Sequence, residues 1–383
     1  MRRAIMALAV CAACLTAAGP ARFRPHTLAA DLKGGYQVYL ADVNRDGTAD
    51  LVALASGMNE LFWFEGPDWK RHVLAAGMSG MINLAACSED AAGYPVFVIA
   101  HGFSSRAEKS IGAVSVLRRD GAVDQPGRRE DIDRLPTSHR IRCADIDGDG
   151  RRVFVNAPLT AADARPPDYR RPVPLVCYAP GEWKRTLIGD GDEGVMHGIH
   201  VVDCDGDGKE DILTASFSGI HRYGRVPDGS WKRTAITAGD PAPWPNCGAS
   251  DVTVGQLAGE RFLASIEPWH GNQVVVYRRD GSRWVRRVID DTYADGHTVV
   301  TADLNGDGRA EIIGGCRQGP RSVYIYHAGE SALEWRRTTL DDGGIAAASC
   351  AVADLNADGR PDIACIGSAT ANLKWYENLG PEE

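Results

Sequence analysis

The chain has 383 residues, a formal net charge of −9 and a sequence pI near 5.6. Lys and Arg are spread along the sequence, so the basic surface that nucleic-acid binding needs is not expected. A chain of this length can hold two domains or one large all-β domain, and internal repeats decide between the two.

The N-terminus is typical of an export signal. Two arginines precede an apolar stretch, and small residues follow it. This pattern predicts a signal peptide over residues 1–18 with cleavage near 18–21, and hence a secreted, periplasmic or cell-surface protein. In an alternative interpretation Cys14 becomes a lipidated N-terminus, although Cys11 stands where such signals usually carry Leu. No later segment approaches the eighteen or so apolar residues of a transmembrane helix, so no membrane span is expected.

Cysteine usage leaves two interpretations open. In an oxidising compartment some of the cysteines would pair, although spacing alone does not give the connectivity. They are equally compatible with small buried side chains on strands. The eight that follow the signal are Cys87, Cys143, Cys177, Cys204, Cys247, Cys316, Cys350 and Cys365.

An Asp-rich pattern recurs along the chain at intervals of about fifty residues or twice that distance. The five copies are ADVNRDGTAD (41–50), ADIDGDGRRV (144–153), VDCDGDGKED (202–211), ADLNGDGRAE (302–311) and ADLNADGRPD (353–362). One degenerate copy fits each long gap, at 82–100 and 250–266, where apolar strands remain but the acidic loop is lost. The chain therefore contains seven repeats.

Each repeat is rich in short β-branched and aromatic segments and lacks helical periodicity, which predicts four strands per unit. Tryptophan-led strands recur at 69–74, 183–188, 231–236, 284–289 and 335–340, and we expect these tryptophans to pack between neighbouring units. Four-stranded units repeated radially form a β-propeller. The sequence thus predicts an all-β fold, a single seven-bladed propeller of four-stranded blades over residues 22–383.

The two ends of the chain complement each other. Residues 22–29 resemble the outer strand of a repeat, and 373–380 resemble a third strand with no fourth strand after it. We therefore expect the N-terminal strand to complete the last blade and close the ring.

Four of the acidic loops follow D-x-[DN]-x-D-G-x-x-[DE], which places oxygen ligands at alternate positions around a glycine-permitted bend. Such hard ligands suit structural Ca²⁺. A tight hairpin turn that merely favours Asp, Asn and Gly is the alternative. The loop at Asp145 carries Val153 in the ninth position and should bind weakly or not at all. The expected calcium ligands are Asp42, Asn44, Asp46 and Asp50; Asp203, Asp205, Asp207 and Asp211; Asp303, Asn305, Asp307 and Glu311; and Asp354, Asn356, Asp358 and Asp362.

These loops, together with the closing WYEN at 375–378, resemble FG-GAP and VCBS repeats. Those are the calcium-loop propeller repeats of integrin α-subunits and many exported bacterial proteins. The resemblance covers nearly the whole mature chain, but the Phe-Gly and Gly-Ala-Pro signature of the integrin repeat is not clearly present. It implies a propeller with calcium in its loops.

A second group of residues maps to the face opposite the acidic loops. This face holds the connections that lead into the first strand of each repeat and out of its second strand. Converging imidazoles, a carboxylate and an arginine are what a metal site or an acid–base site needs. Each histidine taken singly is equally compatible with a hydrogen-bonded structural role. We expect catalytic or metal-binding roles, with Zn²⁺ or a similar ion as a possible cofactor, for His139, His197, His270, His297 and Arg317. The expected ligand-binding residues are His101, Trp244, Glu267 and Trp269.

The unit WKRTLIGDGDEGVMHGIHVVDCDGDGKEDIL is similar to the propeller of aldos-2-ulose dehydratase in its His-Gly before the acidic loop. This chain is too short for the additional propeller and cupin parts of that enzyme. The resemblance implies a carbohydrate lyase or dehydratase. A non-catalytic propeller that recognises a glycan or an extracellular protein through the same rim is the alternative, and fold alone does not decide.

Overall fold

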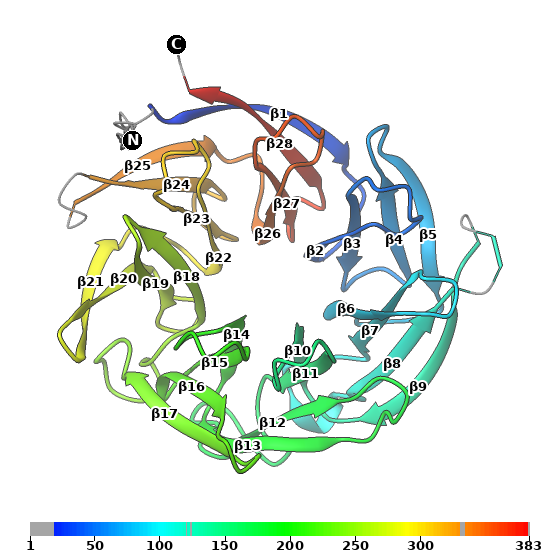
Figure 1. Cartoon of the computed structure of the whole chain (residues 1–383), viewed down its shortest axis with the longest axis horizontal. Coiled ribbons are helices and arrows are strands. Elements are labelled where there is room, and N and C mark those ends of the chain that lie inside the picture. The colour runs from blue at the N-terminus through cyan, green and yellow to red at the C-terminus, as the bar shows by residue number, and fades with distance from the viewer. Residues whose placement is uncertain (1–18, 120, 123–124, 330–333, 382–383) are drawn as a thin grey trace, which may run out of the picture.

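The computed structural model describes residues 19–119, 121–122, 125–329 and 334–381, and the predicted signal peptide lies outside them. Within these ranges the chain forms seven antiparallel four-stranded sheets arranged around a central axis (Figure 1). The fold is the predicted seven-bladed β-propeller. No helix in these ranges is long and apolar enough to cross a membrane.

The strands follow one another from the axis outward in each blade. Blade 1 contains β2 (Gly35–Ala41), β3 (Asp50–Ala55), β4 (Glu60–Glu65) and β5 (Lys70–Ala76); blade 2 contains β6 (Asn83–Glu89), β7 (Pro95–His101), β8 (Ala113–Arg118) and β9 (Arg128–Arg134), with a 3₁₀ turn η1 (Ala107–Lys109) after β7. Blade 3 contains β10 (Ser138–Ala144), β11 (Val153–Pro158), β12 (Pro172–Tyr178) and β13 (Thr186–Glu193); blade 4 contains β14 (Met196–Val202), β15 (Asp211–Ser216), β16 (Gly219–Arg225) and β17 (Trp231–Thr237). Blade 5 contains β18 (Asp251–Leu257), β19 (Glu260–Glu267), β20 (Gln273–Asp280) and β21 (Arg283–Asp290); blade 6 contains β22 (Gly296–Ala302), β23 (Glu311–Cys316), β24 (Val323–Ala328) and β25 (Trp335–Asp341). Blade 7 contains β26 (Ala347–Ala353), β27 (Asp362–Gly367), β28 (Leu373–Pro381) and, as its outermost strand, β1 (Ala21–Ala29).

Strand β1 closes the ring. It pairs antiparallel with β28, with Pro25 opposite Tyr376 and Ala29 opposite Leu373. The His26 ring stacks on Trp375 at 4.5 Å between ring centroids. This pairing covers the edge of β28 that would otherwise be unpaired, so the first and last segments of the chain stabilise the same blade. The predicted closure of the ring is confirmed.

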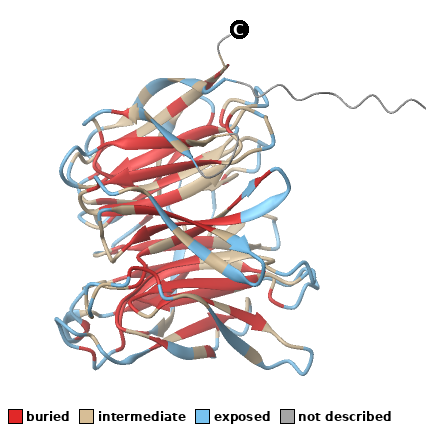
Figure 2. Ribbon diagram, turned by 90° about the vertical axis from the view of Figure 1, so that its left-hand side faces the viewer, coloured by how far each residue is buried: buried red, intermediate tan, exposed pale blue. Residues whose placement is uncertain are grey.

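Burial follows from the packing of blade against blade. The second strands β3, β15, β23 and β27 are buried along their whole length, because neighbouring blades cover both of their faces (Figure 2). The tryptophans that begin the outer strands lie at these junctions, as Trp335 does against Phe262 of the preceding blade. The predicted role of these tryptophans in packing between blades is confirmed.

A tyrosine, a carboxylate and a cation form a repeated contact between blades that the sequence patterns did not reveal. Tyr178 donates its hydroxyl hydrogen to Asp133 of the preceding blade at 2.6 Å, and Arg185 pairs with the same carboxylate. Corresponding trios are Tyr223, Asp192 and Arg233; Tyr326, Asp290 and Arg337; and Tyr376, Asp341 and Lys374. Each trio ties the third strand of one blade to the outer strand of the blade before it.

Deleting residues 19–29 should lower the melting temperature by about 10 °C or more and cause aggregation, because loss of β1 exposes the apolar edge of β28. Thermal unfolding and light scattering measure this, with the chain that starts at Gly19 as reference. A truncated protein as soluble and as stable as the reference would contradict the closure described here.

Candidate functional site

The two faces of the ring carry different kinds of loop. The connections between first and second strands hold the acidic repeats, and the connections into first strands and out of second strands meet at the opposite face. The acidic loops of blades 1, 3, 4, 6 and 7 are close copies of one another, whereas the connections at the opposite face differ in length and composition. Variable loops on a rigid scaffold are where binding and catalysis usually reside.

The acidic loops have converging oxygen atoms. In the fourth blade, carboxylate oxygens of Asp203, Asp205 and Asp211 lie within 4.8 Å of one another. In the first blade, Asp42 accepts hydrogen bonds from the backbone N–H groups of Asp46 and Gly47, which holds the loop in its bend. This all-oxygen donor set fits Ca²⁺, although calcium binding itself remains a prediction.

The ninth position of these loops has a structural role that the motif did not predict. Asp50 is buried and accepts hydrogen bonds from the backbone N–H groups of Val43 at 2.7 Å and Gly66 at 2.9 Å. Asp362 receives N–H groups of Leu355 and Asn378 in the same way. The ninth carboxylate thus connects the loop to the end of the third strand, and burial raises the pKa of Asp50 to about 6 despite these hydrogen bonds.

The loop with Val153 in the ninth position has arginine partners. Arg151 pairs with Asp149 at 2.6 Å, and Arg225 pairs with Asp147 at 3.1 Å. Arginines also pair with Asp205 and Asp358 of two complete loops, so the weak binding expected for the Val153 loop stays a prediction.

Four aromatic side chains converge at the axis on the opposite face. Tyr36, His139, His197 and His297 each occupy the second residue of an innermost strand, in blades 1, 3, 4 and 6. At each of these positions the pairing with the second strand is shifted by one residue. A bulge of this kind re-aims a side chain, and here it accompanies four rings that meet at the axis instead of alternating along the strand.

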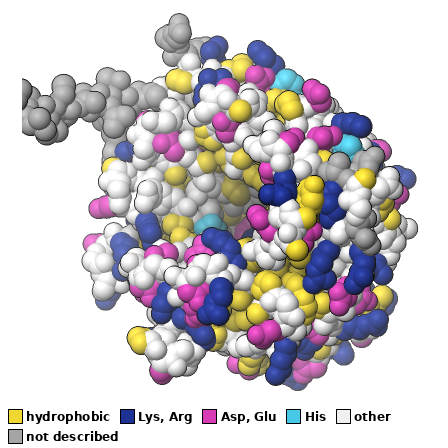
Figure 3. All heavy atoms as spheres, turned by 45° about the vertical axis from the view of Figure 1, so that its right-hand side comes forward, with side chains coloured by type: hydrophobic (Ala, Val, Ile, Leu, Met, Phe, Trp, Pro, Cys, Tyr) yellow, Lys and Arg dark blue, Asp and Glu magenta, His cyan; other side chains and the backbone are white. Residues whose placement is uncertain are grey.

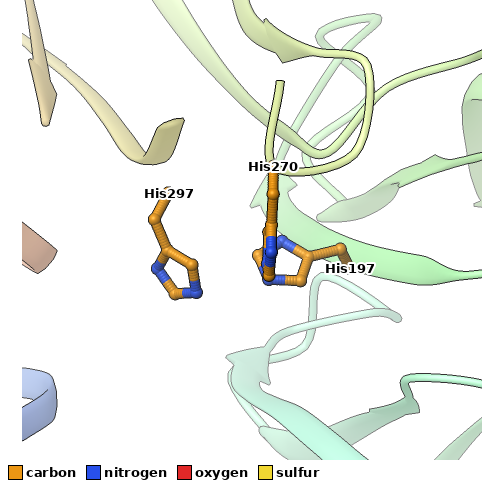
Figure 4. A group of neighbouring side chains, drawn as sticks. All are labelled: His197, His270 and His297. Atoms are coloured by element: carbon orange, nitrogen blue, oxygen red, sulfur yellow. The ribbon is translucent and has the colours of Figure 1, made fainter. Parts of the chain in front are cut away.

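His270 joins these rings from the loop after β19 (Figure 4). Its backbone is in the left-handed region, with φ of 48°, which is uncommon for a residue with a side chain and is often found at functional sites. The His270 Nε2 atom lies 3.2 Å from the His197 Nε2 atom. Ligand atoms of His197, His270 and His297 all lie within 4.8 Å of one another. We call these three residues the histidine trio.

Hydrogen bonds define which ring nitrogens can bind a ligand. His297 Nδ1 donates to the Ala348 carbonyl at 2.6 Å, which leaves the buried Nε2 as an acceptor with no partner in the described chain. His197 Nδ1 likewise lies 3.1 Å from the Ser250 carbonyl, so its Nε2 faces the trio. Burial lowers the pKa of both imidazoles well below the ordinary value; Arg140 lowers both pKa values further, and Arg317 adds to the shift of His297. Both rings are therefore neutral at physiological pH.

Arg317 and Asp295 flank the trio. Arg317 donates to Asp295 at 2.8 Å, and its Nη2 atom lies 3.1 Å from His270 Nδ1, while Asp295 lies 3.3 Å from the same ring nitrogen. Burial lowers the pKa of His270 to about 3, Arg317 adds to the shift and Asp295 opposes it. His270 can therefore hold its proton on Nε2, or on Nδ1 with Asp295 as acceptor.

Tyr36 and His139 form a second pair beside the trio. The Tyr36 hydroxyl lies 2.6 Å from His139 Nε2, and His139 contacts His197 at 4.9 Å between ring centroids. Burial, followed by Arg140, keeps the pKa of His139 well below its ordinary value. Tyr36 was not among the predicted catalytic residues, although its position in its repeat is equivalent to those of His139, His197 and His297.

An aromatic surface adjoins the trio. The ring centroid of Trp269 lies 4.8 Å from that of His270 and 5.7 Å from that of Phe217, and Phe217 packs edge-on against Trp244. Tyr169, from the long connection between β11 and β12, contacts Trp269 as well. The structure thus places both predicted tryptophans, each partly exposed, beside the predicted histidines.

His101 and Glu267 are not brought to this cluster. His101 lies 2.7 Å from Ser115 within blade 2. Glu267 is fully buried, accepts the Tyr277 hydroxyl hydrogen at 2.5 Å and pairs with Arg286. Both residues end a second strand, and their side chains turn toward the outer strands of their own blade. Tyr277, Glu267 and Arg286 all belong to blade 5, so this tyrosine–carboxylate–arginine contact lies within one blade.

Fold and loops together define a seven-bladed propeller with FG-GAP-like repeats and a histidine-lined axial site. Residues 111–280 match the family model described as the β-propeller domain of aldos-2-ulose dehydratase, and residues 303–365 match that of an FG-GAP-like repeat. Both resemblances inferred from the sequence are confirmed.

A curated relative gives the same result. The chain is 26% identical over 233 residues to the aldos-2-ulose dehydratase of Phanerodontia chrysosporium, and the match covers 53% of this chain and 25% of that enzyme. The chain thus matches about a quarter of the enzyme's length.

Chelation of calcium should lower the melting temperature, because carboxylates crowded in the loops repel one another without a divalent ion. An ion present at a hundred times its dissociation constant adds about 2.7 kcal/mol per site to the free energy of unfolding. Thermal unfolding with EDTA, and again after calcium is restored, measures this. An unchanged melt after confirmed metal removal would contradict occupied loops.

The free energy of unfolding of chelator-treated protein should fall below pH 6.5 partly because of His297. Its pKa is lowered in the folded state, so the imidazole takes up a proton only on unfolding, and acid favours the unfolded chain. The H297Q variant should lose up to about 1.4 kcal/mol per pH unit of this dependence. Urea unfolding between pH 5 and 7 compares the two proteins, and equal slopes would show that His297 titrates normally when folded.

Proposed function

We propose that this protein is a carbohydrate lyase or dehydratase whose active site is the histidine trio. The observation that carries the proposal is the convergence of three neutral imidazoles, two of them fully buried, beside an arginine and an aromatic surface. The similarity to a carbohydrate-acting dehydratase supports the substrate class, and the relative's complete activity is not transferred.

The trio fits a zinc ion or a similar divalent metal. Two imidazole nitrogens on one tetrahedral zinc lie about 3.3 Å apart when each Zn–N bond is about 2.0–2.1 Å, and the His197 and His270 nitrogens are 3.2 Å apart. The orphaned Nε2 of His297 supplies a third donor. Asp295 would hold the Nδ1 proton of His270, as carboxylates commonly do for ligating histidines. When bound, such a metal polarises a carbonyl or hydroxyl oxygen of the substrate.

The remaining residues provide binding and proton transfer. Partly exposed Trp269 and Trp244 offer faces on which a sugar ring can stack. Neutral His139, hydrogen-bonded to Tyr36, can accept a proton from the carbon next to a carbonyl or carboxylate group. Elimination then breaks that C–H bond and a C–O bond, forms a C=C bond, and releases water or an alcohol to which a proton is returned.

The aromatic surface also supports a second candidate function, non-catalytic glycan binding. Trp244 and Trp269 are partly exposed beside Phe217, and stacking alone can hold a sugar without any chemistry. Extracellular protein ligands would use the same face. A measurement of turnover distinguishes this binding function from the proposed enzymatic function.

We also propose that the protein acts outside the cytoplasm. Cys87 and Cys143 join blades 2 and 3 in a disulfide, and Cys350 and Cys365 join β26 to β27. Disulfides persist in oxidising compartments, which supports the export that the N-terminal pattern indicates. Four other described cysteines, Cys177, Cys204, Cys247 and Cys316, are free.

Replacing His197 and His297 together by Ala should remove bound transition metal and lower turnover by about a hundredfold or more, since acid–base and metal contributions to catalysis are of that order. The protein is first loaded with zinc and freed of excess. Metal content is measured by mass spectrometry and turnover by ultraviolet absorbance of the unsaturated product, with 2-keto sugars and uronic-acid polysaccharides as substrates.

The matched control is the double variant H26A/H72A. These histidines lie on the outermost strands β1 and β5, where they stack on Trp375 and Trp63, whereas the trio lies at the axis. Both double variants remove two histidines. If the His197/His297 variant folds and keeps metal and turnover, the trio is structural and the enzyme proposal is wrong. Glycan binding without turnover in the zinc-loaded wild type would favour the binding function.

A further inference from the structure

A channel of about 390 Å³, lined by both polar and apolar side chains, lies at the ring axis beside the histidine trio. All seven innermost strands contribute to its lining, and His297 lines it as well. Figure 3 shows the molecule hollowed near its middle. Two arginines of β10, Arg140 and Arg142, face one acidic residue, Asp251 of β18, in this channel.

Neither arginine has an ion-pair partner among the residues that the structure describes. Arg140, only 5% exposed, donates from Nε to the His197 carbonyl at 3.0 Å, and Arg142 donates to Asn83 Oδ1 and to the Ile141 carbonyl. No carboxylate of the described chain lies within 4 Å of either guanidinium group. The cations of the four inter-blade trios, in contrast, each pair with a carboxylate, as Arg233 pairs with Asp192.

The channel therefore holds an excess of positive charge. Burial, with Arg140 adding to it, lowers the pKa of Arg142 to about 10, which still leaves the group charged at neutral pH. Asp251 supplies one negative charge for two positive ones, and the described contact of its carboxylate is with the N–H of Val252 at 3.0 Å. A buried charge without a counter-charge is costly, so a mobile anion in the channel would stabilise the folded protein.

We infer that the axial channel binds one small oxyanion between Arg140 and Arg142. Guanidinium groups match the paired oxygens of carboxylate and phosphate, and the channel has room for an anion of this kind together with water. The shared ligand chemistry is a planar or tetrahedral oxyanion. Its source is either inorganic phosphate or the carboxylate of a sugar acid. The inference does not depend on the proposed catalysis, because the two arginines would bind the anion directly and need no metal.

Equilibrium dialysis of the folded protein with radiolabelled phosphate tests the inference, at constant ionic strength in a zwitterionic buffer without added divalent metal. Wild-type protein should bind about one equivalent. R142Q should weaken binding at least tenfold, since it removes one of two charge-assisted contacts. R287Q removes a charge from an exposed arginine on β21 and should bind as wild type does.

Competition by galacturonate distinguishes the two sources. Displacement of phosphate shows that the channel admits sugar acids, and its absence limits the ligand to inorganic oxyanions; both results support the site. Phosphate binding that persists in the H197A/H297A variant locates the anion at the arginines and not at the trio. Loss in that variant but not in R142Q would overturn the inference.

A chemical measurement covers the case in which R142Q does not fold. Phenylglyoxal modifies accessible guanidinium groups, and peptide mass spectrometry locates the modified residues. Phosphate should protect Arg142 of the wild-type protein and leave Arg287 equally reactive. Absence of saturable phosphate binding together with unprotected Arg142 would contradict the inference, whatever the outcome of the turnover assays.

Discussion

The pairing of β1 with β28 closes the ring of blades. It joins the two ends of the chain in one blade and fixes seven blades around one axis. Only in a closed ring do the starts of innermost strands from blades 1, 3, 4 and 6 face one another. Tyr36 and His297, far apart in sequence, thereby come within 5.2 Å between ring centroids.

Regular packing between blades keeps that axis rigid. Tryptophans at the blade junctions and the repeated tyrosine–carboxylate contacts bury both hydrophobic area and satisfied polar groups. Buried carboxylates such as Asp192 are stable there because each accepts several hydrogen bonds and faces a cation. A site that needs ring nitrogens within a few tenths of an ångström gains from a scaffold of this kind.

The repeat made most of the fold predictable. The number of repeats predicted the number of blades, and the partial repeats at the two ends of the chain predicted ring closure. Both predictions depend on local patterns that recur along the sequence. The histidines were predicted to share one face because they occupy equivalent connections in their repeats. What the sequence did not reveal depends on side-chain direction and on contacts between blades. Glu267 and His101 turn into their own blades, Asp50 connects backbone groups, and Cys87 meets Cys143 only because two innermost strands are neighbours.

We propose that His197, His270 and His297 hold one divalent metal ion at the axis. The most direct measurement is anomalous scattering on both sides of the zinc absorption edge, from crystals of the protein grown with zinc. We expect one anomalous peak about 2.0–2.1 Å from ring nitrogens of all three histidines. If zinc is present elsewhere in the same crystal and no peak lies at the trio, the three histidines do not form a metal site.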